Sequence, residues 1–228
     1  ELASLTSVGG NERDLLVGSV KSNLGHTLEA AGLVGLVKLL LSMDRGEIPP
    51  TIHLKTLTSQ FDWPAHRVRV VDKTVAWPKP ANDREKNKRC AVNAFGIGGL
   101  NGHAVIESPE SIRQENIRHS EHTAFASRQK SHNQIEPIAI VGRGVVLPDA
   151  FTIDSFAKLL SCDGTAIGQP PRDRWLGNSE TGSSPFHVPT HSGGYINGYR
   201  FDGQPYRIPP KQVNLANPLQ MMLIDAVE

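Results

Sequence analysis

A lysine and a histidine on one short segment are the residues of this chain best suited to chemistry. Lys21 and His26 belong to the run Lys-Ser-Asn-Leu-Gly-His, which leads directly into an apolar segment. A histidine beside a helix N-terminus meets the positive end of the helix dipole, which disfavours the protonated ring. We therefore expect a buried, neutral imidazole at His26 that donates an N–H to a carbonyl oxygen and stabilises an enolate formed there.

A glycine-rich segment later in the chain is the second feature that could bind a ligand. Residues 95–102 read Phe-Gly-Ile-Gly-Gly-Leu-Asn-Gly and follow a predicted strand. Because glycine has no Cβ, such a loop lets the main chain approach a ligand closely. Taken alone, a tight strand-to-strand turn is an equally good interpretation. A dinucleotide fingerprint is excluded, because the third glycine is missing and the loop precedes a strand instead of a helix.

Predicted strands and one buried helix would position these two motifs. Apolar runs indicate strands over residues 15–20, 68–71, 90–94 and 103–107. Residues 28–43 are apolar on nearly all sides of a helix, which predicts burial, and their small side chains would let another backbone pack closely. Arg45 and Gly46, followed by Pro49 and Pro50, predict where this helix ends.

Composition indicates an ordinary globular protein. The 228 residues carry a net charge of +1, with 38% hydrophobic and 21% charged residues, which excludes a global basic field for nucleic acid. No apolar run is long enough to span a bilayer. Cys90 and Cys162 lack metal-ligand spacing and fit free thiols in a reducing compartment, so we expect a cytoplasmic protein. The chain starts at Glu1 without a signal peptide and stops within a predicted helix, so we expect a fragment of a longer polypeptide.

A change in composition divides the chain into two units. Residues 108–134 are rich in Ser, Gln, Arg and His and poor in large apolar residues, which predicts a linker. Residues 138–142 then predict a buried strand, and residues 151–160 an amphipathic helix. Residues 177–194 are predicted to be loop. Another apolar helix is predicted over residues 219–227, with Pro218 in its first turn.

Several further histidines do not predict a metal site. No carboxylate or cysteine accompanies them at ligand spacing, so we interpret them as solvated loop residues. They are His119, His122, His132, His187 and His191.

Taken together, residues 16–106 resemble the C-terminal part of a ketosynthase, the thiolase-like condensing enzyme of polyketide and fatty acid synthesis. The Lys-Ser-Asn-x-Gly-His turn, the Glu-Ala-Ala-Gly run at 29–32, Ile-Pro-Pro at 48–50 and the glycine loop carry this resemblance. Residues 136–220 resemble instead the beginning of a ketosynthase. The resemblance implies an α/β, thiolase-like layered α-β-α-β-α fold, present as two partial units. Their expected boundaries are 1–108 and 136–228, joined by a linker at 109–135.

The family resemblance also implies roles for individual residues. Ketosynthases are acyltransferases that use a Cys-His-His set for decarboxylative Claisen condensation of acyl and malonyl thioesters. His26 matches the second histidine and Lys21 the associated lysine, while the cysteine and first histidine would precede Glu1, so the isolated chain is expected to be inactive. Residues expected to bind the acyl substrate are Asn23, Phe95, Ile97, Gly98, Gly99 and Asn101. Ile97 and Leu100 depart from the family pattern, which usually has phenylalanine and threonine there.

The order of the two units implies particular partners. A ketosynthase end followed by a ketosynthase beginning resembles the tandem arrangement of polyunsaturated fatty acid synthases, in which a ketosynthase precedes a chain-length factor and pairs with it. Substrates would arrive on the phosphopantetheine arm of an acyl carrier protein, with no cofactor or metal bound directly. The alternative is that the first unit is itself a non-catalytic, chain-length-factor-like scaffold that shapes the acyl tunnel and the dimer.

Overall fold

The computed structural model describes residues 14–79, 87–96, 98–108, 138–171 and 192–227, in which helices and short strands alternate. Within these ranges the strands form four two-stranded sheets. The α/β class predicted from the sequence is confirmed. The predicted linker and most of the predicted loop at 177–194 lie outside the described residues, although the end of that loop forms a short strand.

The strands of the first unit form three separate two-stranded pairs. β1 (Leu15–Val17) pairs in parallel with β3 (Val68–Val70), and β2 (Glu47–Ile48) pairs antiparallel with β4 (Val75–Ala76). The longest pair is the hairpin of β5 (Arg89–Phe95) and β6 (Asn101–Glu107), in register from end to end.

Three helical segments follow β1. They are α2 (Lys21–Leu24), the 3-10 turn η1 (Leu28–Ala30) and α3 (Ala31–Arg45). Gly46 closes α3 in the left-handed region with φ 68°, as expected for a glycine after a helix. An added Cβ on Gly32 would lie 3.1 Å from Ala94 Cβ, and one on Gly35 would lie 3.3 Å from Val92 Cγ2. The predicted close packing of this helix is therefore confirmed, and its partner is β5.

Both helices predicted in the second unit are present, the first of them beginning two residues later than predicted. α4 (Ile153–Ser161) has a capping box in which Thr152 and Ser155 exchange hydrogen bonds, and α6 (Pro218–Val227) begins at its proline. The remaining elements of this unit are β7 (Ile167–Gly168), β8 (Gly193–Gly194) and α5 (Pro210–Leu215).

The predicted buried strand at residues 138–142 is wrong for this chain. These residues form no strand, and Ile138 and Val141 are 94% and 96% exposed. A strand needs a neighbour that accepts and donates its main-chain hydrogen bonds. No described strand lies alongside this segment, so its apolar side chains stay in solvent.

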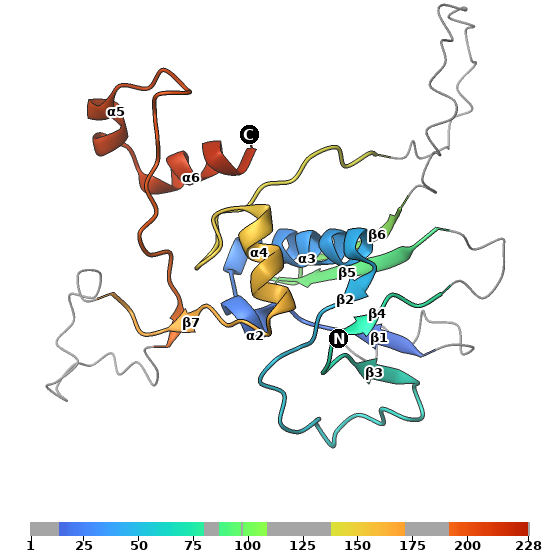
Figure 1. The fold of residues 1–228 in the computed structure, drawn as a ribbon. Helices are drawn as coiled ribbons and strands as arrows, with labels where there is room; N and C mark the ends of the chain where they lie inside the picture. Colours follow the sequence, from blue (N-terminus) through green and yellow to red (C-terminus); the bar gives the residue numbers. More distant parts are fainter. Residues whose placement is uncertain (1–13, 80–86, 97, 109–137, 172–191, 228) are drawn as a thin grey trace, which may run out of the picture.

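Both units contribute to one hydrophobic core. Figure 1 shows α3 next to both the β5–β6 hairpin and α4. Phe156 and Leu160 of α4 belong to the same buried cluster as Val34 and Leu41 of α3. Phe156 is fully buried. The buried cluster consists of Val20, Leu24, Val34, Leu41, Val145, Leu147, Ala150, Phe156, Ala157, Leu160 and Ala166. Polar contacts at the edge of this junction join Arg45 to Ser161 at 2.9 Å and pair Arg143 with Asp44.

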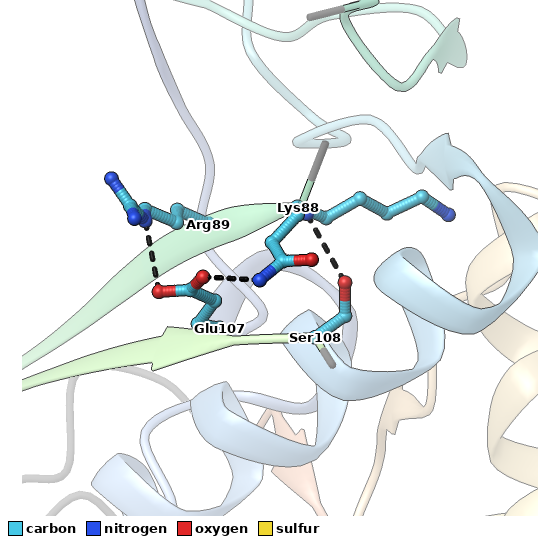
Figure 2. A network of polar contacts seen from close by, with 5 residues as sticks. Lys88, Arg89, Glu107 and Ser108 are labelled. Atoms are coloured by element: carbon cyan, nitrogen blue, oxygen red, sulfur yellow. Dashed lines mark hydrogen bonds and ion pairs between the residues drawn. The ribbon is translucent and has the colours of Figure 1, made fainter. Parts of the chain in front are cut away.

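Side-chain hydrogen bonds join the two strands at the open end of the β5–β6 hairpin, as Figure 2 shows. Glu107 accepts hydrogen bonds from Asn87 Nδ2 at 2.5 Å and from Arg89 Nε at 2.9 Å. Both hydrogen bonds lower the pKa of the Glu107 carboxyl, and the bond from Asn87 has the larger effect. Lys88 N donates to Ser108 Oγ at 3.1 Å on the same edge. The hairpin that packs on α3 is therefore closed at the end remote from its glycine loop.

Candidate active site

The turn from residue 20 to residue 28, called here the histidine turn, presents Lys21 and His26. Its first half is the single turn of α2, closed by hydrogen bonds from Leu24 N to Val20 O at 3.3 Å and from Gly25 N to Lys21 O at 2.8 Å. Gly25 then reverses the chain with φ 82°, a conformation that favours glycine. Both Lys21 and His26 are exposed.

The ring of His26 is oriented by the main chain that follows it. Leu28 N donates a hydrogen bond to His26 Nδ1 at 3.1 Å. Because an amide can only donate, Nδ1 carries no proton, and the neutral ring has its proton on Nε2. The expected neutral donor therefore fits this geometry. The expectation that the ring is buried is wrong for this chain, because no described segment covers His26.

Asn23 faces the interior of the protein. The residue is 1% exposed, and its Nδ2 donates to Gly164 O at 2.9 Å. Its own main-chain oxygen accepts a hydrogen bond from Ala166 N at 2.7 Å. The residue predicted to contact substrate thus connects the histidine turn to the second unit through both its side chain and its main chain.

A second contact of the same kind involves β8, and sequence reasoning missed it. A Cβ added to Gly194 would lie 2.2 Å from Leu24 O, so only glycine fits at this position of the strand. The contact places β8 directly against the end of α2. The sequence signal was the pair Gly193-Gly194, which the loop prediction over residues 177–194 absorbed.

The glycine loop forms the turn of the β5–β6 hairpin. Gly96 N donates to Leu100 O at 2.9 Å, Gly99 N donates to Gly96 O at 3.0 Å, and Gly99 has φ 83°. An added Cβ on Gly98 or Gly99 would meet nothing within 4 Å. Phe95 is 41% exposed and Asn101 is its register partner. The tip of the loop is therefore open, and Ile97 lies outside the described residues.

Helix α3 connects the histidine turn to the glycine loop. The helix starts shortly after His26, and Gly32 in its first turn packs against Ala94, which directly precedes Phe95. The histidine turn and the glycine loop therefore lie at the same end of α3. No hydrogen bond joins them among the described residues.

Lys38 is a buried charged residue on α3 that the sequence did not single out. It is 6% exposed, and Nζ donates to Ser19 O at 3.1 Å and Pro50 O at 3.4 Å. Burial lowers its pKa from the usual 10.5 to about 8. The one sign in the sequence is a lysine inside an otherwise apolar helical stretch.

The two cysteines do not have the surroundings of a nucleophile. Cys90 Sγ lies 3.4 Å from Met43 Sδ, and burial raises the pKa of this thiol. A catalytic cysteine needs the opposite shift, usually from a nearby cation or a helix N-terminus. Cys162 follows the C-terminal end of α4. The five histidines interpreted as solvated lie outside the described residues, and the part of the chain that is described holds no cluster of three metal-ligating side chains.

Comparison with known families finds ketosynthase matches in two parts of the chain. Residues 1–55 match the family "Beta-ketoacyl synthase, C-terminal domain". Residues 135–228 match "Beta-ketoacyl synthase, N-terminal domain". Two segments of the chain therefore match ketosynthase domains, and the segment that matches the C-terminal domain precedes the one that matches the N-terminal domain, as the sequence predicted.

Similar curated proteins are polyketide synthases. Polyketide synthase GfsA of Streptomyces halstedii is 42% identical over 100 residues, which is 44% of this chain and 1% of that protein. Highly reducing polyketide synthase apmlA of Arthrinium phaeospermum is 41% identical over 123 residues, 52% of this chain and 5% of that protein. Erythronolide synthase EryA3 of Saccharopolyspora erythraea is 40% identical over 120 residues, 50% of this chain and 4% of that protein. The chain thus spans a small part of each relative's length.

Solved structures similar to part of the chain are ketosynthases. The ketosynthase from module 6 of the bacillaene synthase from Bacillus subtilis 168 has 35% sequence identity and a TM-score of 0.44, covering 48% of this chain and 21% of that one. Ketosynthase twelve of the bacillaene polyketide synthase in Bacillus amyloliquefaciens has 33% identity and a TM-score of 0.43, covering 48% of this chain and 20% of that one. No helix in the described ranges is long and apolar enough to cross a membrane.

Proposed function

We propose that this chain is part of a polyketide or fatty acid synthase and that its first segment takes part in decarboxylative Claisen condensation. The supporting observation is the hydrogen bond from Leu28 N to His26 Nδ1, which leaves Nε2–H as the outward donor. A donor fixed before the reaction stabilises a developing oxyanion without reorganisation. The family matches and the polyketide synthase relatives support the same reaction class.

In the proposed reaction a malonyl thioester loses carbon dioxide. The bond between the carboxylate carbon and the α-carbon breaks, and its electron pair moves into the enolate, whose oxygen accepts the hydrogen bond from His26 Nε2. The enolate carbon then bonds to the carbonyl carbon of an acyl group held on a cysteine, and that cysteine leaves as thiolate. Lys21 adds a positive charge on the same turn, which favours the anionic intermediate.

The other catalytic groups would come from the longer protein that carries this chain. Neither Cys90 nor Cys162 has an activating environment, so the acyl-bearing cysteine and a further histidine belong to another segment of that protein. The second segment is the beginning of a second ketosynthase or chain-length factor, which would pair with the first. Malonyl and acyl groups would be delivered on the phosphopantetheine arm of an acyl carrier protein.

The test is the variant His26→Ala in the complete synthase. Removal of one oxyanion donor typically lowers kcat by about 100-fold to 1,000-fold. We expect malonyl decarboxylation and condensation, followed by release of labelled carbon dioxide and by product mass, to fall by that factor. The control is His66→Ala, which removes an exposed histidine of the same segment that stacks on Phe61 at 4.9 Å between ring centroids. Undiminished turnover in His26→Ala would overturn the proposal and favour the scaffold alternative.

A further inference from the structure

The side chain of Lys38 contacts the main chain of two segments, one of which directly precedes the histidine turn. Its Nζ donates to Ser19 O at 3.1 Å and to Pro50 O at 3.4 Å. The neighbouring Thr51 Oγ1 accepts a hydrogen bond from Ser19 N at 3.1 Å. Both main-chain groups of Ser19 are therefore held, one by α3 and one by the segment that follows β2.

Ser19 in turn fixes the start of α2. Its Oγ accepts a hydrogen bond from Lys21 N at 3.2 Å, and its main-chain oxygen also accepts from Ser22 Oγ at 3.3 Å. Other hydrogen bonds of the short helix α2 run to Val20 O and Lys21 O. The position of Ser19 thus decides where Lys21 and the rest of the histidine turn begin.

The histidine turn is consequently anchored on α3 at both of its ends. Its far end runs through η1 into the first residue of α3, and its near end is held by Lys38 in the middle of the same helix. Without Lys38, the near end would be held by Thr51 and by contacts within the turn and with the second segment. The path between the two anchors contains Lys21 and His26.

The chemical environment of Lys38 is unusual for a residue that serves packing alone. In the described part of the chain its ammonium pairs with carbonyl oxygens and with no carboxylate. A buried ammonium without a counter-ion is unfavourable, and an apolar side chain of the same length would avoid that penalty. Burial accordingly lowers the pKa of Lys38 to about 8. What the amine provides at this position is the connection between two main-chain segments.

We propose that Lys38 is a positioning residue of the candidate active site, which fixes the histidine turn by tying the main chain at Ser19 and Pro50 to α3. It contacts neither substrate nor His26, and it acts through the turn that carries His26. This inference rests on the proposed function for its catalytic consequence. The structural part, the holding of the turn, can be measured independently of activity.

The first experiment is amide hydrogen exchange on the complete chain with Lys38→Met. We expect exchange at residues 23–25 and at Leu28 to accelerate at least tenfold, with less than a threefold change in the β5–β6 hairpin. The matched control is Ser42→Ala, one turn further along α3. Ser42 is 4% exposed and its Oγ donates to Lys38 O at 2.8 Å, within α3 itself. This control should not accelerate exchange in the histidine turn.

Unchanged exchange at residues 23–25 in Lys38→Met, or equal acceleration in Ser42→Ala, would overturn the proposal. If Lys38→Met does not fold, Lys38→Gln replaces it in the same measurement, because the shorter amide keeps an N–H donor while losing the charge. In that variant we expect exchange in the histidine turn between the wild-type rate and ten times that rate. An exchange rate equal to the wild type in Lys38→Gln would equally overturn the proposal.

The second experiment is kinetic and uses the complete synthase. We expect Lys38→Met to lower kcat for condensation about tenfold, with KM for the malonyl carrier changed less than twofold, and Ser42→Ala to leave kcat within twofold. Faster exchange with unchanged kcat would overturn the positioning role. If His26→Ala itself leaves turnover unchanged, the proposed function fails, and the exchange measurement alone decides whether Lys38 holds the turn.

Discussion

Replacing Gly194 by alanine tests whether the second segment packs against the histidine turn. An added Cβ at this position would lie 2.2 Å from Leu24 O and 3.1 Å from Pro148 Cγ. The first contact is far inside van der Waals distance and involves main-chain oxygen, which has no rotamer to relieve it. Either β8 or the end of α2 must therefore shift by roughly 1 Å, since carbon–oxygen contacts need more than about 3 Å.

The expected effect follows from the cost of overpacking a well-packed site. Such substitutions typically cost 1–3 kcal/mol, and we expect Gly194→Ala to lower the free energy of unfolding by about 2 kcal/mol, a roughly 30-fold change in the folding equilibrium. Gly168→Ala is the control. Gly168 lies on β7, the partner strand of β8, and an added Cβ there would meet nothing within 4 Å. Its effect should stay within about 0.5 kcal/mol.

The assay is urea unfolding of the purified chain, followed by tryptophan fluorescence. Trp63 and Trp77 lie in the first segment and Trp175 in the second, so the fluorescence signal reports the unfolding of both segments. The midpoint should fall while the urea dependence stays constant, which identifies a change in stability. If Gly194→Ala and Gly168→Ala have the same midpoint, β8 does not pack on α2 in solution, and the described junction is wrong.

Two further outcomes follow from buried residues. Phe156→Ala should destabilise the chain by about 3–5 kcal/mol in the same urea assay, because Phe156 is fully buried in the shared core; a loss below about 1 kcal/mol would contradict that core. The pKa of Lys38 is about 8 in the folded chain and 10.5 in the unfolded chain. Between these two pH values the folded state binds fewer protons than the unfolded state, so stability rises with pH. The free energy of unfolding of the wild type relative to Lys38→Met should therefore rise by about 3 kcal/mol from pH 7.5 to pH 10.5. A difference that stays flat or falls over this range would contradict the burial of the ammonium.

Elements with strong local signals could be predicted from the sequence. The end of α3 at Gly46 followed from a glycine that tolerates φ 68°, and the start of α6 from Pro218. The paired positions of β5 and β6 followed from two apolar runs on either side of a glycine loop. In each case the determinant is a property of a few neighbouring residues, which a single sequence contains.

Predictions that depended on distant partners were less successful. Ile138 and Val141 were expected in a buried strand, but burial of an apolar run requires a neighbouring strand that the described residues do not supply. The same reason explains the exposure of His26, whose cover would have to come from other segments. Leu33 of α3 is likewise 67% exposed, although its helix is apolar on nearly all sides. A local apolar pattern indicates a preference for burial, but it does not indicate whether another segment is present to cover those side chains.

The contacts around the candidate site were hidden for a related reason. Asn23 was predicted to bind substrate, whereas its amide donates to Gly164 O, far away in the sequence. Lys38 gave no interpretable pattern, because its partners are the main-chain oxygens of Ser19 and Pro50, and any residue type offers such an oxygen. Side chains that bind main chain across the fold leave little trace in sequence spacing.

The order of the two segments along the chain does not prevent their packing together. For a connection of about 30 residues, the length-dependent part of the loop-closure entropy is only about 3 kcal/mol. Burying one large apolar side chain contributes about 1.5–3 kcal/mol, and the junction buries Phe156 and Leu160 against the side of α3. The burial of two such side chains therefore offsets the entropic cost of closing the connection. Packing between α3 and α4 therefore determines whether this junction forms. The reversed order of the ketosynthase segments adds only the small entropic cost of closing the connection.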